Sequence, residues 1–158
     1  MNNADFKILI VDDTPKNIQV AAGFLQDEGY VLSFATSGTE ALKMLKATPF
    51  DLVLLDVVMP EMDGYTTCRK IKEEEALRDI PIIFLTVKDD SESIIEGFEA
   101  GGVDYITKPF NPYELLARVK THLALKHHME LNRKNDQMLL QKTRSAILSE
   151  LISNIAHQ

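Results

Sequence analysis

The sequence contains a single cysteine, Cys68, so no disulfide bond can form within the chain. It also lacks a basic stretch followed by an apolar leader, and no apolar run is long enough to cross a lipid bilayer. The glycine patterns of P-loops and of dinucleotide-binding folds do not occur either. These absences predict a cytoplasmic location, no membrane segment in this chain, and a fold outside those two nucleotide-binding classes.

Acidic residues outnumber basic ones, which gives the 158 residues a formal net charge of −7. The nearest approach to a basic cluster is the mixed stretch from Lys126 to Lys142, so direct nucleic-acid binding is not expected. With 45% hydrophobic and 26% charged residues, the composition is typical of a folded globular protein. The length suits one core domain with an appendage.

From Phe6 onward, apolar runs of strand length alternate with segments of helical period. The predicted strands are Phe6–Val11, Val31–Ala35, Asp51–Leu55, Pro81–Leu85 and Asp104–Ile106. The predicted helices are Lys16–Glu28, Gly38–Ala47, Gly64–Glu75, Ser91–Gly101 and one that begins at Pro112, which Asn111 can cap. The strand runs are mostly apolar without alternation, as in parallel strands that are covered on both faces. The pattern predicts an α/β fold with five parallel strands and helices on both faces of the sheet.

The last predicted helix is unusually long, because no glycine or proline occurs from Tyr113 to Gln158. Apolar residues at helical spacing lie at its start (Leu116, Val119 and Leu123) and near its end (Leu148, Leu151 or Ile152, and Ile155), with a polar middle at His127–Gln137. We therefore divide the chain into a core domain, residues 1–123, and a helical linker, residues 124–158. A five-stranded core cannot bury so long an apolar stripe, so we expect the linker to pair with a second copy as a coiled coil. A frayed, partly disordered tail is the alternative.

Polar residues stand where the predicted strands end. Asp12 and Asp13 follow the first strand, Asp56 the third, Thr86 the fourth, and Lys108 with Pro109 the fifth. In an open α/β sheet the carboxyl ends of the strands line one crevice, so these side chains are expected to meet there.

Three carboxylates in one crevice repel one another, and a cation is a usual resolution. Mg²⁺ suits such a site because it binds one or two carboxylates and leaves room for phosphate oxygens. Beside the ion, the Asp56 carboxylate can attack phosphorus to give an acyl phosphate. The Lys108 ammonium can offset the charge of the transferred oxygens, and the Thr86 hydroxyl can donate a hydrogen bond to one of them.

Each of these residues has a simpler explanation when taken alone. An Asp-Asp pair after a strand is often a helix cap, a Lys-Pro pair is usually a turn, and a threonine at a strand end is usually a good strand former. These separate explanations do not account for five such residues that occur, in order, at the ends of four strands. The combination therefore favours a functional site.

The sequence resembles the response-regulator receiver domains (CheY-like) of two-component signalling over about residues 5 to 123. The matching motifs are Ile10-Val11-Asp12-Asp13, Leu54-Leu55-Asp56, Met59-Pro60, Met62-Asp63-Gly64, Phe84-Leu85-Thr86, and the run Asp104-Tyr105-Ile106-Thr107-Lys108-Pro109-Phe110. The resemblance implies a flavodoxin-like fold with strand order 2-1-3-4-5. It also implies that a histidine kinase or phosphotransfer protein donates a phosphoryl group to Asp56.

The resemblance further implies the roles of individual residues. Mg²⁺ is expected on Asp12, Asp13, Asp56 and the backbone carbonyl of Val58, and Thr86 and Tyr105 are expected to act as a switch pair. The bond between Lys108 and Pro109 is expected to be cis. Val87 departs from the family, which usually has a small residue there, and this bulkier side chain predicts narrower access to the site. Val58 and Lys88 occupy variable flanking positions that bear on the lifetime of the phosphoryl group.

The final residues, Ile152 to Gln158, resemble the start of the H-box of histidine kinases, in which His157 takes the place of the phosphoaccepting histidine. This likeness suggests the N-terminal receiver of a hybrid histidine kinase. One alternative is a stand-alone response regulator whose C-terminal helix dimerises or docks on a partner. Another is a metal-dependent aspartyl phosphatase, which is disfavoured because such enzymes have D-x-D rather than the adjacent Asp12-Asp13.

Overall fold

The computed structural model describes residues 2–156, and His157 of the H-box resemblance lies outside the described residues. The chain divides into two units, with the boundary between Leu123 and Ala124, and each unit is described by itself.

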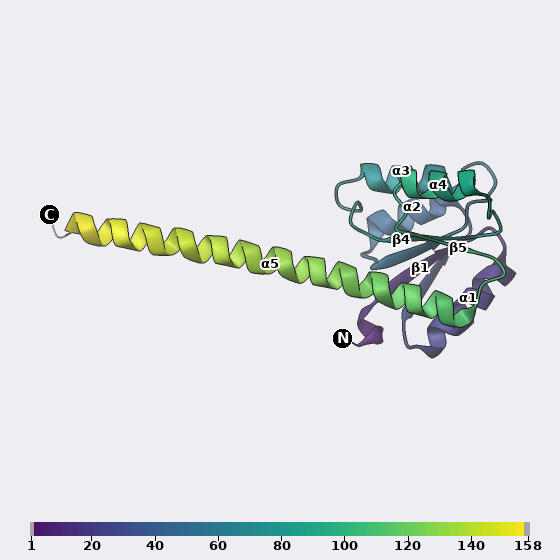
Figure 1. The fold of residues 1–158 in the computed structure, drawn as a ribbon, viewed down its shortest axis with the longest axis horizontal. Helices are drawn as coiled ribbons and strands as arrows, with labels where there is room; N and C mark the ends of the chain where they lie inside the picture. The colour runs from purple at the N-terminus through teal and green to yellow at the C-terminus, as the bar shows by residue number, and fades with distance from the viewer. Residues whose placement is uncertain (1, 157–158) are drawn as a thin grey trace. The chain divides into compact units, whose positions relative to one another are not determined.

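The first unit is built on a five-stranded parallel sheet (Figure 1). The strands are β1 (Lys7–Val11), β2 (Val31–Ala35), β3 (Leu52–Leu55), β4 (Ile82–Thr86) and β5 (Asp104–Thr107). Their order in the sheet is β2-β1-β3-β4-β5, and every neighbouring pair is parallel. This confirms the flavodoxin-like arrangement that the family resemblance implied.

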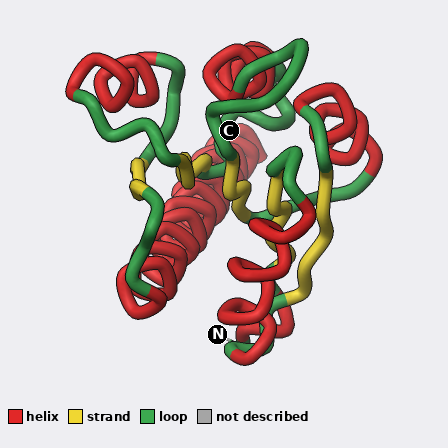
Figure 2. The backbone as a smooth tube through the Cα atoms, turned by 90° about the vertical axis from the view of Figure 1, so that its right-hand side faces the viewer, coloured by secondary structure: helices red, strands yellow, loops and turns green. Residues whose placement is uncertain are grey.

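Helices cover both faces of the sheet (Figures 1 and 2). They are α1 (Pro15–Asp27), α2 (Gly38–Ala47), α3 (Gly64–Glu73), α4 (Ser91–Glu99) and the start of α5 (Pro112–Ala156), and a short 3-10 turn, η1 (Asn3–Asp5), precedes β1. Alternate residues of a strand point to opposite faces, so Leu9 and Val11 pack with α2 and α3, whereas Ile8 and Ile10 pack with α1 and α5. The central strands are therefore apolar throughout because both faces are buried.

Side-chain caps explain where most helices begin. The cap side chains accept hydrogen bonds from backbone N–H groups in the first turn of each helix. They belong to Ser37 before α2, Asp63 before α3 and Asp90 before α4. Asn111 accepts a hydrogen bond from the backbone N–H of Tyr113 at 2.8 Å, as expected for the cap of α5. These caps agree with the predicted starts of the four helices.

Several predicted boundaries differ from the structure by one or two residues, and α4, like α3, ends two residues earlier than predicted. Two of the differences show what ends an element. Strand β4 runs from Ile82 to Thr86 and not from Pro81 to Leu85, because proline has no N–H to donate, while the Thr86–Thr107 pair continues the ladder. Helix α3 ends at Glu73, two residues early, because Glu74 has an extended backbone and the Arg78 side chain bonds the free carbonyl of Lys72.

The start of α5 packs on the sheet through a slightly different set of residues from the predicted one. Leu115, Val119 and Leu123 are buried, whereas Leu116 is only partly buried against the same core. Residues four apart lie almost above one another on a helix, so Leu115 continues the line of Val119 and Leu123 better than Leu116 does.

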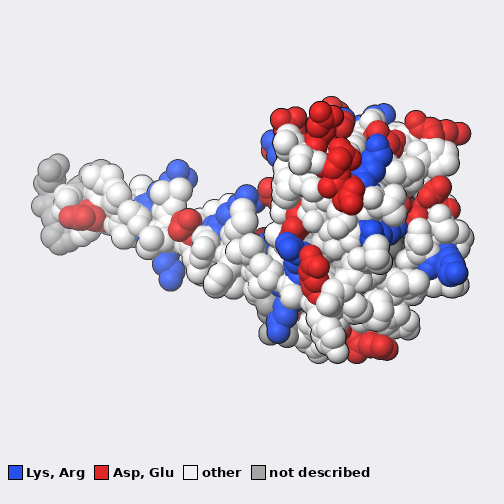
Figure 3. Space-filling view, turned by 45° about the vertical axis from the view of Figure 1, so that its right-hand side comes forward, with Lys and Arg blue, Asp and Glu red and all other residues white. Residues whose placement is uncertain are grey.

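The second unit, described up to Ala156, is helical and continues α5. Its side chains are largely exposed in the single chain, and they include large apolar residues near its end: Ile147, Leu148, Leu151 and Ile152. Within residues 2–156, no helix is long and apolar enough to cross a membrane. Acidic and basic side chains both occur on the molecular face drawn in Figure 3.

Candidate functional site

Strand register places the acidic residues side by side. Val11 of β1 pairs with Leu55 of β3, so the next residues, Asp12 and Asp56, are neighbours at the carboxyl end of the sheet. The ladder continues past the strand ends: the Asp56 N–H donates to the Val11 carbonyl at 2.9 Å, and the Asp12 N–H donates to the Ala35 carbonyl at 3.1 Å. The two carboxylates are thereby fixed by the backbone of the central strands.

Asp13 completes a cluster of three carboxylates with Asp12 and Asp56. One oxygen from each lies within 4.8 Å of the others. Asp12 and Asp56 are buried, with 4% and 7% of their surface exposed, whereas Asp13 is exposed. The cluster is thus open to solvent on the side of Asp13.

Lys108 brings a positive charge to this cluster. Its Nζ lies 2.7 Å from Asp12 Oδ2 and 3.5 Å from Asp56 Oδ2. The Lys108 N–H donates to the Thr86 carbonyl at 2.7 Å, and the Lys108–Pro109 peptide bond is cis, as the resemblance implied. One ammonium against three carboxylates leaves two negative charges when all four groups are ionised, so the site favours a further cation.

Asp12 does not act as the cap of α1. The N-cap residue is Thr14, which makes no side-chain cap bond, and Pro15 follows it in the first turn. Asp12 Oδ1 instead accepts from the Thr14 N–H at 2.9 Å and from Asn17 Nδ2 at 3.5 Å. These bonds orient the Asp12 carboxylate toward the crevice.

The groups around the Asp56 carboxyl shift its pKa in opposite directions. Burial raises its pKa above the ordinary value, and the nearby charge of Asp12 raises it further. A hydrogen bond from the Thr86 hydroxyl, the Lys108 ammonium and the Val58 N–H all lower the pKa without reversing the direction. Asp56 is therefore a carboxylate whose negative charge is costly in this site.

Thr86 and Tyr105 lie on neighbouring strands. Thr86 is fully buried at the end of β4, next to the crevice. Tyr105, in β5, packs its ring against Phe84 with 5.8 Å between centroids, and its hydroxyl donates to the Lys88 carbonyl at 2.8 Å. The loop after Thr86 is thus tied to the Tyr105 hydroxyl.

The flanking residues differ in how they meet the site. Val58 is 49% exposed, and its N–H donates to Asp56 Oδ1 at 3.3 Å. Val87 is 64% exposed, so its side chain extends into solvent. The Lys88 N–H lies 3.5 Å from the Thr86 hydroxyl oxygen.

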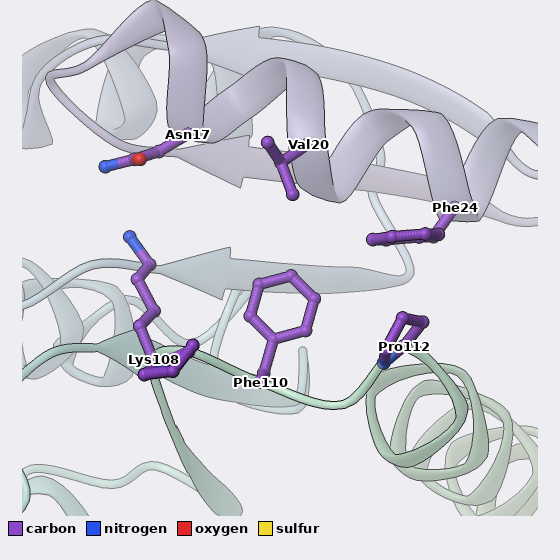
Figure 4. A pocket seen from close by; sticks show the side chains of 7 residues that line it. Asn17, Val20, Phe24, Lys108, Phe110 and Pro112 are labelled. Atoms are coloured by element: carbon purple, nitrogen blue, oxygen red, sulfur yellow. The ribbon is translucent and has the colours of Figure 1, made fainter.

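An apolar pocket of about 310 Å³ lies beside Lys108 (Figure 4). It is lined by Asn17, Val20, Phe24, Lys108, Pro109, Phe110 and Pro112. The Phe24 and Phe110 rings meet edge to face, with 6.2 Å between centroids. Since Asn17 and Lys108 belong to both the pocket and the acidic cluster, the two are continuous.

Sequence reasoning gave no role in the site to three residues, although Gly64 belongs to one of the matching motifs. Asn17 touches Asp12, and its place in the helical turn after Asp12-Asp13 could have suggested this contact. Gly64 approaches the Asp56 carbonyl so closely that a Cβ atom would overlap that oxygen. The Tyr65 hydroxyl lies 3.3 Å from the Tyr105 hydroxyl, and no sequence signal joins residues 40 positions apart.

A parallel five-stranded sheet with an acidic cluster and a lysine at its carboxyl edge is the arrangement expected of a receiver domain, and comparison with known proteins agrees. Residues 8–120 match the family model of the response regulator receiver domain. The chain belongs to this family.

Several known proteins are similar to the chain. It is 43% identical over 117 residues to the transcriptional regulatory protein ResD of Bacillus subtilis, covering 74% of this chain and 48% of that protein. It is 41% identical over 115 residues to the response regulator PleD of Caulobacter vibrioides, covering 73% and 25%. The receiver domain of a signal transduction histidine kinase from Syntrophus aciditrophicus superposes with a TM-score of 0.71 at 39% identity, covering 75% of this chain and 90% of that one.

The matched region is only part of the curated relatives. The chain spans 48% of the length of the first of them and 25% of the second.

Proposed function

We propose that this chain is a phosphoacceptor of a two-component phosphorelay, in which phosphorylation of Asp56 switches a signalling output. The observation that carries the proposal is the position of Asp56, buried between a lysine ammonium and two further carboxylates at the edge of the sheet. A histidine kinase or a phosphotransfer protein supplies the phosphoryl group from a phosphohistidine.

Mg²⁺ fits the residues of the site. The donors are carboxylate oxygens, which hard divalent cations prefer, and the cluster has an excess of negative charge. Ligands at about 2.1 Å from an octahedral ion lie at most about 4.2 Å apart. The oxygens of the cluster, within 4.8 Å of one another, need only a small adjustment to reach that spacing. Asp12, Asp13, Asp56 and the Val58 carbonyl are the proposed ligands, and the ion supplies charge neutralisation of phosphoryl oxygens when bound.

The chemical step is a displacement at phosphorus. An Asp56 carboxylate oxygen forms the new bond to phosphorus while the bond from phosphorus to the donor histidine nitrogen breaks. The leaving imidazole keeps the electron pair and takes up a proton. Lys108, which lies 3.5 Å from Asp56, offsets the charge of the transferred oxygens, and the Thr86 hydroxyl donates to one of them.

Thr86 and Tyr105 transmit the change. A phosphoryl group on Asp56 gives the Thr86 hydroxyl a stronger acceptor than the carboxylate it bonds now. Thr86 leads directly into the loop whose Lys88 carbonyl accepts from Tyr105, so a shift of that loop alters the Tyr105 bond. The two residues therefore act as a switch pair.

The helical second unit serves as a connector. Its exposed apolar residues favour pairing with a second copy of the chain, and residues 152–158 resemble a histidine-kinase H-box. A receiver of a histidine kinase is among the similar structures, which is compatible with the N-terminal receiver of a hybrid kinase. A stand-alone regulator with a dimerising helix is the alternative. Reading the coding sequence beyond Gln158 separates them, because a kinase continues into an ATP-binding domain.

Intact-protein mass spectrometry tests the phosphorylation. After incubation with Mg²⁺ and acetyl phosphate, the chain is expected to gain the mass of one phosphoryl group, and EDTA is expected to prevent the gain. Asp56→Asn should abolish it, whereas Asp27→Asn, at the exposed end of α1, should leave it intact. Equal labelling of Asp56→Asn and the parent chain would show that Asp56 is not the acceptor.

Calorimetry tests the metal. Asp13 is the exposed member of the cluster, so Asp13→Asn removes a ligand at little cost to the core. We expect it to weaken Mg²⁺ binding by about tenfold or more, since even residues that only support metal ligands have effects of that size. Asp89→Asn, an exposed aspartate in the loop before α4, is the matched control. Unchanged Mg²⁺ affinity in Asp13→Asn would remove this residue from the proposed ligands.

A further inference from the structure

Two tyrosine hydroxyls meet beneath the start of α4. Tyr65, the second residue of α3, is 3% exposed, and its hydroxyl oxygen lies 3.3 Å from that of Tyr105 in β5. Tyr65 also approaches the backbone of α4, because its hydroxyl donates to the Ser93 carbonyl at 2.8 Å. One side chain of α3 thus reaches both α4 and the proposed switch residue.

A count of protons shows what the contact between the two hydroxyls can do. Each phenol has one proton, and each already donates at 2.8 Å to a carbonyl: Tyr65 to Ser93, and Tyr105 to Lys88. No proton remains for the 3.3 Å contact while both of these bonds hold. If the loop that carries Lys88 moves away, the Tyr105 proton can turn to the Tyr65 oxygen, which still has a free lone pair. The Tyr65 hydroxyl is therefore a second acceptor for Tyr105.

Packing keeps the Tyr105 ring within reach of this second acceptor. Phe84 contacts both tyrosines, with ring centroids 5.5 Å from Tyr65 and 5.8 Å from Tyr105. On the other side, a Cβ atom at Gly97 of α4 would lie 2.9 Å from Tyr105 Cδ2, so only glycine leaves room for the ring. The ring is held between Phe84 and the backbone of α4.

The protonation state of Tyr105 is suited to this exchange. Burial raises the pKa of its phenol, and the hydrogen-bond contact with Tyr65 raises it further. Tyr105 therefore keeps its proton at neutral pH and can donate it to either oxygen.

We propose that Tyr65 is a positioning residue for the switch: its hydroxyl anchors α4 through Ser93, and it retains the Tyr105 ring between Phe84 and α4 when the bond to Lys88 is lost. This inference rests on the proposed function only in taking Tyr105 as a switch residue. The inference is based on the contact between the two phenol hydroxyls. Tyr65 is hydrogen-bonded to Ser93 within α4, and Tyr105 is hydrogen-bonded to Lys88 in the loop before α4.

Fluorine NMR can follow Tyr105 directly. The chain has four tyrosines, so uniform labelling with 3-fluorotyrosine gives four sites, and each Tyr→Phe variant assigns one of them. Tyr65→Phe removes only the hydroxyl and keeps the ring. Tyr113→Phe is the matched control, because Tyr113 is 81% exposed. Spectra are recorded with and without Mg²⁺ and acetyl phosphate.

In Tyr65→Phe we expect a second Tyr105 resonance, which reports a second position of the ring. Its population should be about two- to tenfold higher than in the parent chain, the range that one net hydrogen bond supports. The gain should be larger with the phosphodonor, because phosphorylation is expected to move the loop that carries Lys88. In Tyr113→Phe the Tyr105 resonance should be unchanged. The same Tyr105 populations in Tyr65→Phe and in the control would overturn the proposal.

The spectra without the phosphodonor separate this inference from the proposed function. They compare the Tyr105 populations of Tyr65→Phe and Tyr113→Phe in the chain as it is, and they need no phosphorylation of Asp56. Failure of the chain to label at Asp56 would therefore overturn the proposed function and leave this inference to be decided by that comparison.

Discussion

The Lys108 ammonium lies closer to Asp12 than to Asp56, at 2.7 Å against 3.5 Å from the nearest oxygen of each. The Asp56 oxygen on that side is therefore only loosely engaged by the ammonium, as the proposed attack on phosphorus requires. The same lysine forms an ion pair with Asp12, and its ammonium lies near enough to Asp56 to contact a phosphoryl group on that residue. Lys108 thus links the proposed metal ligands to the proposed acceptor.

Replacing Lys108 by methionine should slow phosphorylation strongly. Lys108→Met keeps the length of the side chain but removes the charge that faces the transferred oxygens. We expect the initial rate of Asp56 labelling by acetyl phosphate to fall by about a hundredfold or more, the usual cost of losing one preorganised electrostatic group. Quenched time points analysed by mass spectrometry measure the rate. Lys120→Met, on the exposed side of α5, is the control, and equal rates in both variants would argue against the role of Lys108.

The sequence was informative where residues are fixed by backbone register. Asp12, Asp56 and Lys108 follow strands directly, and parallel pairing places such residues at one edge whatever their side chains do. The contacts of Tyr65 and Gly64 could not be read in the same way. They depend on how closely α3 approaches the sheet, a distance set by the packing of many side chains.

The start of α5 illustrates the same limit on a smaller scale. Both Leu115 and Leu116 are at helical spacing from later apolar residues, and only the rotation of the helix on the sheet shows that Leu115 is the fully buried one. Similarly, the hydrophobic pattern placed the end of α3 two residues too late, because it does not show the extended backbone of Glu74 or the hydrogen bond from Arg78 to the Lys72 carbonyl.

Asp56 and Asp104 should respond to pH in opposite directions. Burial raises the pKa of Asp104, but hydrogen bonds from His122 and Arg118 outweigh burial, so the pKa of this carboxyl is lowered. A lowered pKa in the folded state means that Asp104 stabilises the fold above its unfolded pKa and loses this effect as pH falls through the folded pKa. The raised pKa of Asp56 has the reverse sign: its ionisation destabilises the fold as pH rises.

Urea unfolding of two variants checks both signs. Without Mg²⁺ at pH 7, Asp104→Asn should lower the unfolding free energy and Asp56→Asn should raise it. The Asp56 difference should shrink when the pH is lowered below the ordinary aspartate pKa, where this carboxyl is protonated in both states. The Asp104 difference should shrink only when the pH falls through the lowered folded-state pKa of Asp104. A destabilised Asp56→Asn at pH 7 would contradict the cost assigned to the buried charge.

Gly64 should be intolerant of any side chain. A Cβ at this position would overlap the Asp56 carbonyl oxygen and lie 2.8 Å from Val57 Cα, both of which are backbone atoms that cannot rotate away. We expect Gly64→Ala to lower the unfolding free energy by about 1–3 kcal/mol, as overpacking does, and to slow Asp56 labelling by displacing the backbone of the acceptor.

Gly23 provides the matched control for this substitution. It also lies in a helix, α1, but a Cβ there would have no other atom within 4 Å. Gly23→Ala should therefore raise stability by about 0.5–1 kcal/mol through better helix propensity. Equal effects of the two substitutions in urea titrations would show that the approach of α3 to Asp56 is not as tight as described.

Leu148→Asp tests pairing of the helical second unit. Leu148 is 59% exposed in the single chain, so replacing it should cost an isolated chain little. In a two-fold coiled coil the same position is buried twice, once from each copy, and an unpaired carboxylate there is strongly disfavoured. Analytical ultracentrifugation should show a dimer for the parent chain and a dissociation constant raised by about two orders of magnitude or more for Leu148→Asp.

Ala146→Asp separates this effect from simple addition of charge. Two residues turn an α-helix by about 200°, so Ala146 lies nearly opposite Leu148, and an aspartate there stays in solvent if Leu148 is in the seam. Ala146→Asp should therefore remain dimeric at concentrations at which Leu148→Asp is monomeric. A parent chain that is monomeric throughout would contradict pairing of two copies, and equal weakening by both substitutions would place the contact on another face of the helix.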